Sequence, residues 1–219
     1  MAWFTDDFNK FFKDLAKNNH KEWFDANRKR YESSVKKPFE AFVAELIKRV
    51  AKLDPAVQIE PKEAIFRINK DIRFSKDKTP YKLSATAIVS PGGRKDHSDP
   101  GIYIELGPEH VQLYGGSYAP DKEQLHKIRS KIAADPNGFR KLYQAKAFTA
   151  HFNGVEGERN KVLPPEFKEI AKVEPLIANK QFFFHGTLPA KTVTDPKLME
   201  IVMEHYKAMR PMNAFLKTS

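Results

Sequence analysis

The stretch IFRINKDIRFSKDKTPYK, from Ile65 to Lys82, decides how the rest of the chain is interpreted. It combines six basic residues and two acidic residues with a few large apolar side chains. Side chains alternate between two faces along an extended chain. One face would carry Phe66, Ile68, Lys70, Ile72 and Phe74, and the other Arg67, Asn69, Asp71, Arg73 and Ser75. The pattern predicts a strand, bent around residues 69–71, with an apolar back and a polar front that can hold an anion. A polar loop up to Pro80 is expected to follow it.

Helical patterns precede and follow this stretch. Residues 1–55 carry apolar side chains at helical spacing, and residues 63–116 change to the period of strands, with a hairpin expected from 102–106 to 111–114. Residues 120–219 return to helical spacing, with one further strand expected at 181–185. We therefore expect a single α+β domain over residues 1–219. Its mainly antiparallel sheet of about four to five strands packs against N-terminal, central and C-terminal helices.

The composition indicates a soluble globular protein. Of 219 residues, 41% are hydrophobic and 30% are charged, which excludes a disordered chain. The absence of cysteine excludes a disulfide framework and thiol chemistry. The N-terminus has acids where a signal peptide has its basic region, and no segment approaches the roughly 20 apolar residues of a membrane span. We expect a cytoplasmic protein that is not inserted in a membrane.

The net charge of +10 favours anionic partners only weakly, because it is spread along the chain. Residues 1–55 carry a net charge of +3, residues 56–119 carry +1 and residues 120–219 carry +6. A nucleic-acid-binding protein more often concentrates its basic residues on one stripe or arm.

Three segments resemble the signature of a known family. They are RINKDIRFSKDKTPYK at 67–82, NNHKEWF at 18–24 and GGSYAPD at 115–121. Together they are similar to domain of unknown function 2461, in the order expected for that family. The resemblance implies a single α+β domain, and it transfers no activity, cofactor or catalytic role.

The basic stretch supplies the main candidates for a binding site. Arg67 and Arg73 offer forked, permanently charged donors that suit phosphate or carboxylate. Asp71 between them would orient one guanidinium group, or act as a general base if the site raised its pKa. The alternative is a solvated strand whose arginine–aspartate pairs contribute little. The family signature favours the functional interpretation.

Three further residues complete the predicted site. Tyr81 and Lys82 follow Pro80, which favours an extended geometry at the preceding residue, so both would close the site from a fixed direction. Tyr81 is equally well explained by packing. Ser117 lies in a glycine turn whose N–H groups can face an anion, although a helix cap at Asp121 would compete for those donors.

No metal or cofactor is expected. The seven histidines show no spacing typical of zinc ligands, and no Walker loop, GxGxxG motif or RNA-recognition motif is present. The leading hypothesis is a protein that binds, and in one version acts on, a phosphorylated or otherwise anionic small molecule at residues 65–82. The two alternatives are a nucleic-acid-binding module and a non-enzymatic protein-interaction domain. The sequence specifies neither a reaction nor an oligomeric state.

Overall fold

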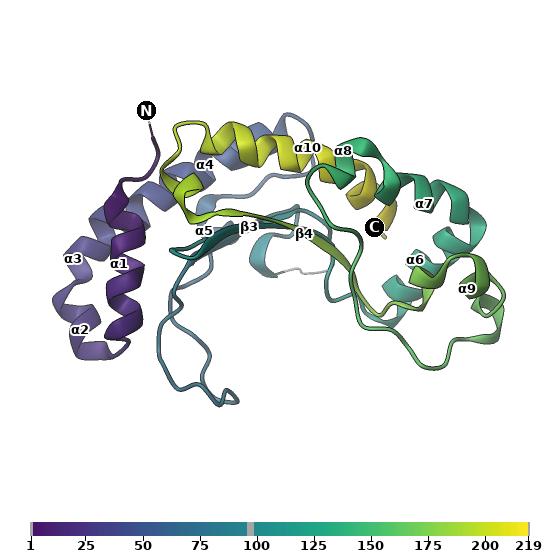
Figure 1. Ribbon diagram of the computed structural model, residues 1–219, viewed down its shortest axis with the longest axis horizontal. Helices are drawn as coiled ribbons and strands as arrows, with labels where there is room; N and C mark the ends of the chain where they lie inside the picture. The colour runs from purple at the N-terminus through teal and green to yellow at the C-terminus, as the bar shows by residue number, and fades with distance from the viewer. Residues whose placement is uncertain (1, 96–98, 219) are drawn as a thin grey trace.

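A computed structural model describes residues 2–95 and 99–218, and Figure 1 shows how their elements are arranged. The N-terminal part contains α1 (Asp6–Lys17), α2 (Lys21–Ala26), α3 (Arg28–Tyr31), the π-helical turn η1 (Glu32–Lys36), α4 (Lys37–Ala51) and α5 (Pro61–Ala64). The central part contains β1 (Ala85–Val89), the short turn η2 (Gly93–Lys95), β2 (Ile102–Leu106) and β3 (His110–Ser117).

The C-terminal part returns to helix and adds one strand. Its first elements are α6 (Lys122–Ala134), α7 (Pro136–Gln144), α8 (Lys146–Thr149), η3 (Pro165–Phe167), α9 (Ile170–Val173) and η4 (Pro175–Ala178). They are followed by β4 (Phe182–Pro189), η5 (Ala190–Thr194) and α10 (Leu198–Leu216).

The four strands form one antiparallel sheet in the order β1-β2-β3-β4. This confirms the predicted α+β fold and its mainly antiparallel sheet. Strands β2 and β3 form the expected hairpin, in which Leu106 lies opposite Val111. Strand β4 overlaps the strand expected at 181–185 but begins at Phe182, and it pairs with β3 from His110 opposite Pro189 to Ser117 opposite Phe182.

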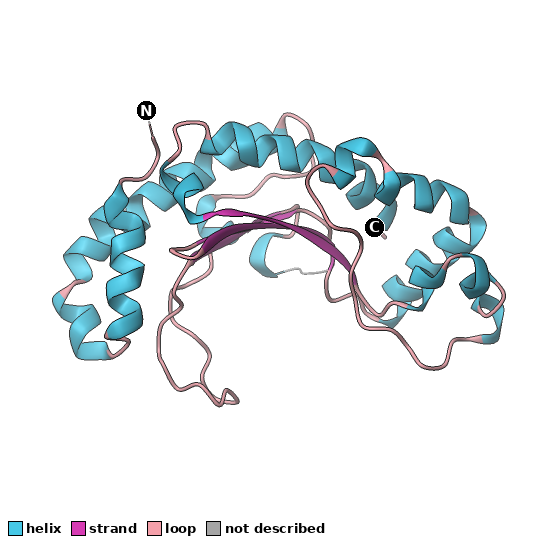
Figure 2. Cartoon of the chain, in the orientation of Figure 1, coloured by secondary structure: helices cyan, strands magenta, loops and turns pink. Residues whose placement is uncertain are grey.

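Helices cover only one face of this sheet in the described part of the chain (Figure 2). Helix α10 packs on β3, and α4 packs on β1. The strands turn their apolar side chains toward these helices, among them Ile104 and Leu113, which are fully buried. Burial of each such side chain contributes about 1.5–3 kcal/mol. The opposite face, which we call the open face, lies between two helical arms that extend past the ends of the sheet (Figure 1). The N-terminal arm consists of α1, α2 and α3, and the C-terminal arm contains α6, α7 and α9.

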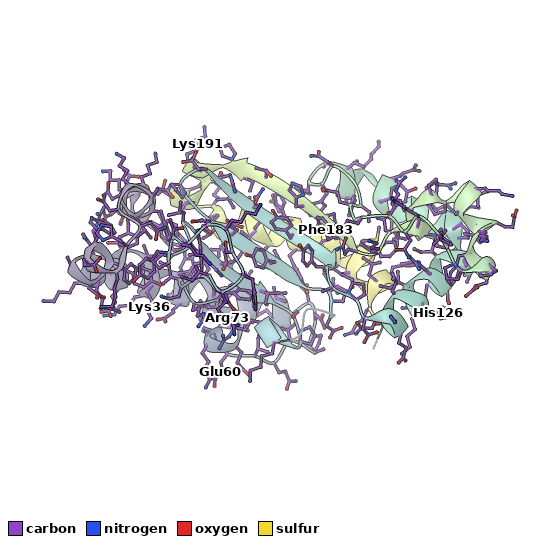
Figure 3. The ribbon with its side chains drawn as sticks, turned by 90° about the horizontal axis from the view of Figure 1, so that it is seen from below. Lys36, Glu60, Arg73, His126, Phe183 and Lys191 are labelled. Carbon is purple, nitrogen blue, oxygen red and sulfur yellow. The ribbon has the colours of Figure 1, made fainter. Side chains whose placement is uncertain are left out.

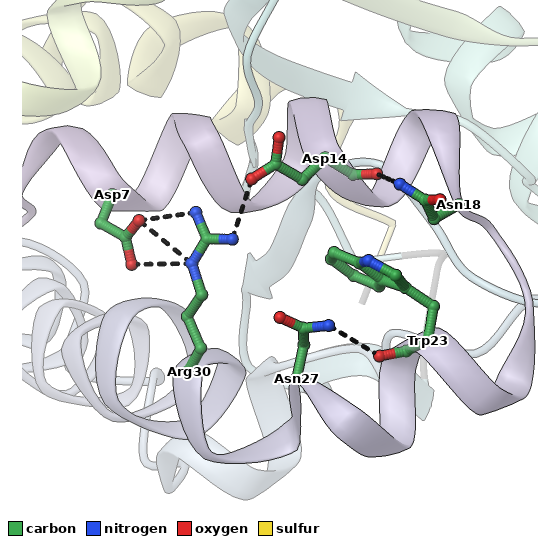
Figure 4. A network of polar contacts seen from close by, with 6 residues as sticks. All are labelled: Asp7, Asp14, Asn18, Trp23, Asn27 and Arg30. Atoms are coloured by element: carbon green, nitrogen blue, oxygen red, sulfur yellow. Dashed lines mark hydrogen bonds and ion pairs between the residues drawn. The ribbon is translucent and has the colours of Figure 1, made fainter.

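The N-terminal arm is held together by Arg30 (Figure 4). Its guanidinium group donates to Asp7 at 2.6 Å from Nη2 and to Asp14 at 2.8 Å from Nη1. Both carboxylates belong to α1, whereas Arg30 belongs to α3, so the ion pairs join the two helices. The hydrogen bond from Arg30 holds the pKa of Asp7 below its ordinary value.

The basic stretch is not a regular strand, so the prediction of a strand at 65–74 is wrong. Isolated bridges join Ile65 to Ala87 and Asn69 to Tyr81, and residues 71–79 form a protruding loop (Figure 1). Two side chains explain the difference. Asp71 accepts from the N–H of Arg73 and Asp77 accepts from the N–H of Thr79. Such local bonds turn the chain and compete with a strand ladder.

The C-terminal arm contains a buried arginine without a carboxylate partner in the described residues. The side chain of Arg129 donates to the carbonyl oxygens of Ile177 at 2.9 Å and Asn179 at 3.0 Å. These bonds attach the end of η4 to α6. Burial lowers the pKa of Arg129.

Replacing Arg129 by alanine should therefore destabilise the protein. The variant leaves buried carbonyl oxygens without donors, and we expect the free energy of unfolding to fall by about 2–4 kcal/mol. Lys127→Ala is the matched control, because Lys127 lies exposed on the same helix and should change stability by less than about 0.5 kcal/mol. Urea denaturation measures both. Equal changes in the two variants would contradict a structural role for Arg129.

Acid should weaken the packing of α10 through His205. This buried residue donates from Nδ1 to the carbonyl of Ile201 at 2.8 Å, and its ring lies 4.3 Å from that of His151. Burial lowers the pKa of His205, and His151 acts in the same direction, whereas the backbone bond and Glu204 oppose the shift. The unfolded chain therefore takes up the proton first as the pH falls through about 6.5.

The free energy of unfolding should consequently decrease between pH 7.5 and about pH 5.5. In His205→Leu this part of the pH dependence should become flatter than in the unmodified protein. Urea denaturation at several pH values makes the comparison, and parallel curves for the two proteins would show that His205 is not responsible.

Candidate functional site on the open face of the sheet

The strand register decides which side chains meet on the open face. One row across the sheet consists of Ile88, Tyr103, Tyr114 and His185, and the next consists of Thr86, Glu105, Gln112 and Thr187. Members of a row lie on neighbouring strands, which are separated by about 4.8 Å. The open face is therefore largely aromatic and polar, whereas the face beneath the helices is apolar and includes the buried Phe182 and Phe184. Figure 3 shows the open face, with Phe183 on β4 near its centre.

Aromatic rings form a continuous row over these strands. Ring centroids are 5.9 Å apart for Phe66 and Tyr103, 5.7 Å for Tyr103 and Tyr114, and 5.1 Å for Tyr114 and His185. The edge-to-face contact between Tyr103 and Tyr114 fixes both rings against each other. Four flat groups from successive segments thus present a stacking surface.

A cavity of about 380 Å³ lies over this surface, and we call it the aromatic cavity. Its aromatic lining consists of Phe66, Tyr103, Tyr114, Tyr118 and Phe183. Glu105 and Asp99 are its only charged lining residues in the described part of the chain. Gly116 is also part of the lining and has a φ of +92°, a conformation that side chains rarely adopt.

A second cavity of about 730 Å³ adjoins the first, because Tyr103 and Glu105 line both. Its cations are Lys13, Lys17, Lys70 and Lys82, and its anions are Glu105 and Glu109. We call it the lysine cavity. Its lining has an excess of two positive charges, whereas the lining of the aromatic cavity has two negative ones.

Lys82 occupies the border between these features. Its Nζ lies 5.1 Å from the ring centroid of Phe66, and its backbone N–H donates to Ile68. The side chain is half-buried, and it forms no ion pair with any carboxylate in residues 2–95 and 99–218. Burial lowers the pKa of Lys82, Arg67 acts in the same direction, and Glu105 opposes the shift.

The neighbouring Tyr81 explains why Lys82 is held in this position. Tyr81 is buried and stacks on Phe24 of α2 with ring centroids 4.2 Å apart. Asn19 donates to the carbonyl of Tyr81 at 2.9 Å and accepts from its N–H at 3.1 Å. The structure thus places Tyr81 in the packing of the N-terminal arm, and it brings Lys82 to the open face.

Arg67 and Arg73 have different surroundings in the structure. Arg67 lines a third cavity of about 530 Å³ beside β1, where the other cations are Lys36, Lys62 and Arg94. Arg73 lies in the protruding loop and donates to both oxygens of Asp71, at 3.0 and 2.7 Å. Arg73 lines none of the three cavities. The predicted clamp between the two arginines therefore has no common cavity.

Asp71 does not have the properties of a general base. Its hydrogen bonds with Arg73 lower the pKa of Asp71 to about 2, which is the opposite of the shift that a general base needs. Of the two roles considered for Asp71, its contacts match the orientation of one guanidinium group. That group lies in solvent rather than in a cavity.

Ser117 faces the helix-covered side of the sheet and is buried. The prediction of a glycine turn before it is wrong, because β3 continues through Gly116 to Ser117. The N–H of Gly116 donates to the side chain of Asn213 at 2.9 Å, and Asp121 caps α6 by accepting from the N–H of Gln124. These bonds satisfy donors that were expected to face an anion.

Two tyrosines of the open face remain protonated well above neutral pH. Burial, together with the charge of Glu105, raises the pKa of Tyr103 to about 12. The same two causes, with Glu156, raise the pKa of Tyr114, whose hydroxyl donates to Gln112 at 2.7 Å. Near pH 7 both rings are therefore neutral stacking surfaces.

Sequence reasoning missed Tyr103, Glu105 and Tyr114, although a signal was present. Strand β2 alternates as Ile102, Tyr103, Ile104, Glu105 and Leu106, so its second face is aromatic and acidic. Glu156 was harder to find, because it comes from an irregular segment that bridges Phe183, and its carboxylate lies 2.9 Å from Nδ1 of His185.

Removing the exposed pair in the loop should leave the site intact. Arg73→Ala and Asp71→Asn should each keep the thermal midpoint and any ligand affinity close to those of the unmodified protein, because exposed pairs contribute little. A thermal-shift assay and calorimetric titration provide the readouts. A tenfold loss of ligand affinity in Arg73→Ala would contradict this expectation and support the predicted arginine clamp.

Comparison with known proteins gives a family and no assigned chemistry. Among the described residues, no group of three or more histidine, aspartate or glutamate side chains could hold a metal ion. No helix in the described ranges is long and apolar enough to cross a membrane.

No curated protein matches the chain. The model of the family described as conserved hypothetical protein (DUF2461) matches residues 7–215, so the chain belongs to that family.

Proposed function

We propose that the open face binds a phosphorylated or otherwise anionic small molecule, and that Lys82 is the principal cation for it. The proposal rests on the burial, pairing and position of the Lys82 ammonium group. Its ammonium group is half-buried, without a carboxylate partner in the described residues, and it lies beside two cavities of ligand size.

An anion would relieve an electrostatic cost at this position. A partly buried charge without a partner loses hydration, and the lowered pKa of Lys82 is a sign of that loss. A phosphate or carboxylate group would restore the missing interaction through a charge-assisted hydrogen bond. Groups that perturb one another in a cavity are frequent at functional sites.

The neighbouring lysines support the same ligand class. Lys13 and Lys17 reach the lysine cavity from α1, so the N-terminal arm contributes directly to it. Lys70 is already occupied, because its Nζ donates to Asp77 and Thr79 at 2.7 Å each. Lys82 is therefore the cation of the basic stretch that is best placed to bind an anionic ligand.

The proposal includes a cytoplasmic setting, because a chain without cysteine is suited to a reducing compartment. It names no reaction.

Replacing Lys82 by methionine tests the proposal, because the variant should lose ligand affinity without losing stability. We expect affinity for the best compound in a panel of phosphorylated sugars and nucleoside monophosphates to fall by tenfold or more, since a charged hydrogen bond contributes about 1.5–3 kcal/mol. The thermal midpoint without ligand should stay constant or rise, because an unpaired half-buried charge is removed.

Lys62→Met is the matched control, because Lys62 is an exposed lysine paired with Glu60 at 2.7 Å. It should change neither quantity. Calorimetric titration gives the affinities. The proposal fails if no compound of the panel binds the unmodified protein, or if Lys82→Met binds as tightly as Lys62→Met.

A further inference from the structure

We propose that the anionic ligand is a nucleotide unit, with its base in the aromatic cavity and its phosphate in the lysine cavity. This inference rests on the proposed function and assigns its ligand class. It is based on two adjoining cavities of unlike charge, which share Tyr103 and Glu105 in their linings.

Charge fixes the orientation of such a ligand. The aromatic cavity has carboxylates and no lysine or arginine in its described lining, so it repels phosphate. The lysine cavity has four ammonium groups against two carboxylates. A ligand that spans the shared wall must therefore be uncharged and flat at one end and anionic at the other, which is the chemistry of a nucleotide.

The fold favours stacking of bases on the sheet. Tyr103 and Tyr114 lie opposite each other on β2 and β3, the two central strands of an antiparallel four-stranded sheet whose other face carries helices. RNA-recognition domains stack bases on aromatic residues of a sheet built from four strands in this manner. Stacking on an aromatic ring tolerates any base, because every base has a π-face.

Glu105 adds a preference among bases. Its Oε1 accepts from Ser84 at 2.8 Å, and its other oxygen has no hydrogen-bond partner in the described part of the chain. A carboxylate accepts hydrogen bonds from the exocyclic amine of a base such as cytosine. Bases with an amino group should therefore bind more tightly than uracil, which presents carbonyl groups in those positions.

The nucleotide unit has two sources, a free nucleotide or a single strand. The protruding loop beside the open face carries Lys76 and the side chain of Phe74, which is 95% exposed. An exposed ring next to basic residues suits a further base and phosphate of a strand. The ligand chemistry at Tyr103 and Lys82 is the same for both sources.

The experiment uses calorimetric titration of the full chain to compare the affinities of four ligands. They are cytidine monophosphate, uridine monophosphate, ribose 5-phosphate and a single-stranded RNA of eight cytidine nucleotides. We expect cytidine monophosphate to bind at least tenfold more tightly than ribose 5-phosphate, and several-fold more tightly than uridine monophosphate. Tyr103→Leu should lower the affinity for cytidine monophosphate to that for ribose 5-phosphate, and it should leave the affinity for ribose 5-phosphate unchanged. Tyr103→Phe keeps the ring and should bind like the unmodified protein, and Tyr114→Leu provides a second test.

The outcomes separate this inference from the proposed function. If ribose 5-phosphate binds as tightly as cytidine monophosphate and neither leucine variant weakens nucleotide binding, the nucleotide assignment is overturned while the anion site stands. If Lys82→Met weakens neither compound, the anion site itself is refuted. RNA affinity far above that of the mononucleotide, falling steeply with salt, supports a strand as the source, and equal affinities support a free nucleotide.

Discussion

The one-sided covering of the sheet is the constraint on which the rest of the structure depends. Helices α4 and α10 bury the apolar face, and that burial supplies the main driving force for folding. Because side chains alternate strictly along a strand, every residue that packs beneath the helices positions its neighbours on the other face. Ile102 and Ile104 are fully buried, and Tyr103 between them is therefore fixed on the open face.

A second set of contacts determines the position of Lys82 beside the open face. The backbone of Tyr81 is bonded in both directions to Asn19, and its ring stacks on Phe24. These contacts belong to the stability of the N-terminal arm, but their consequence is the placement of Lys82 over Phe66. The arm thus holds an ammonium group where it forms no ion pair with a carboxylate of the described chain, and where only the longer-range charge of Glu105 favours it. Costs of this kind are typical of functional sites, where stability is exchanged for binding.

The fold class and the hairpin could be predicted because their segments have a periodic signal, and the additional strand could be predicted because aromatic residues favour strands. Residues 102–114 alternate cleanly around a turn, and the aromatic run at 182–184 was read as a strand. The prediction of a strand before the loop is wrong because Asp71 and Asp77 bond to nearby backbone N–H groups, an effect that alternation does not reveal. The sequence analysis predicts a site at Arg67 and Arg73 because charge is conspicuous in a sequence, and the structure gives these two residues no common cavity. The positions of Tyr103 and Glu105 depend instead on strand pairing with distant residues.

The central claim is that the aromatic row and Lys82 belong to one ligand site. Anomalous diffraction from crystals grown with 5-bromocytidine monophosphate tests it most directly, because the bromine peak locates the base and the connected density locates the phosphate. We predict a bromine peak over the rings of Tyr103 and Tyr114, with the phosphate within hydrogen-bond distance of Lys82. A peak in the cavity that contains Arg67, with the open face empty, would contradict the account.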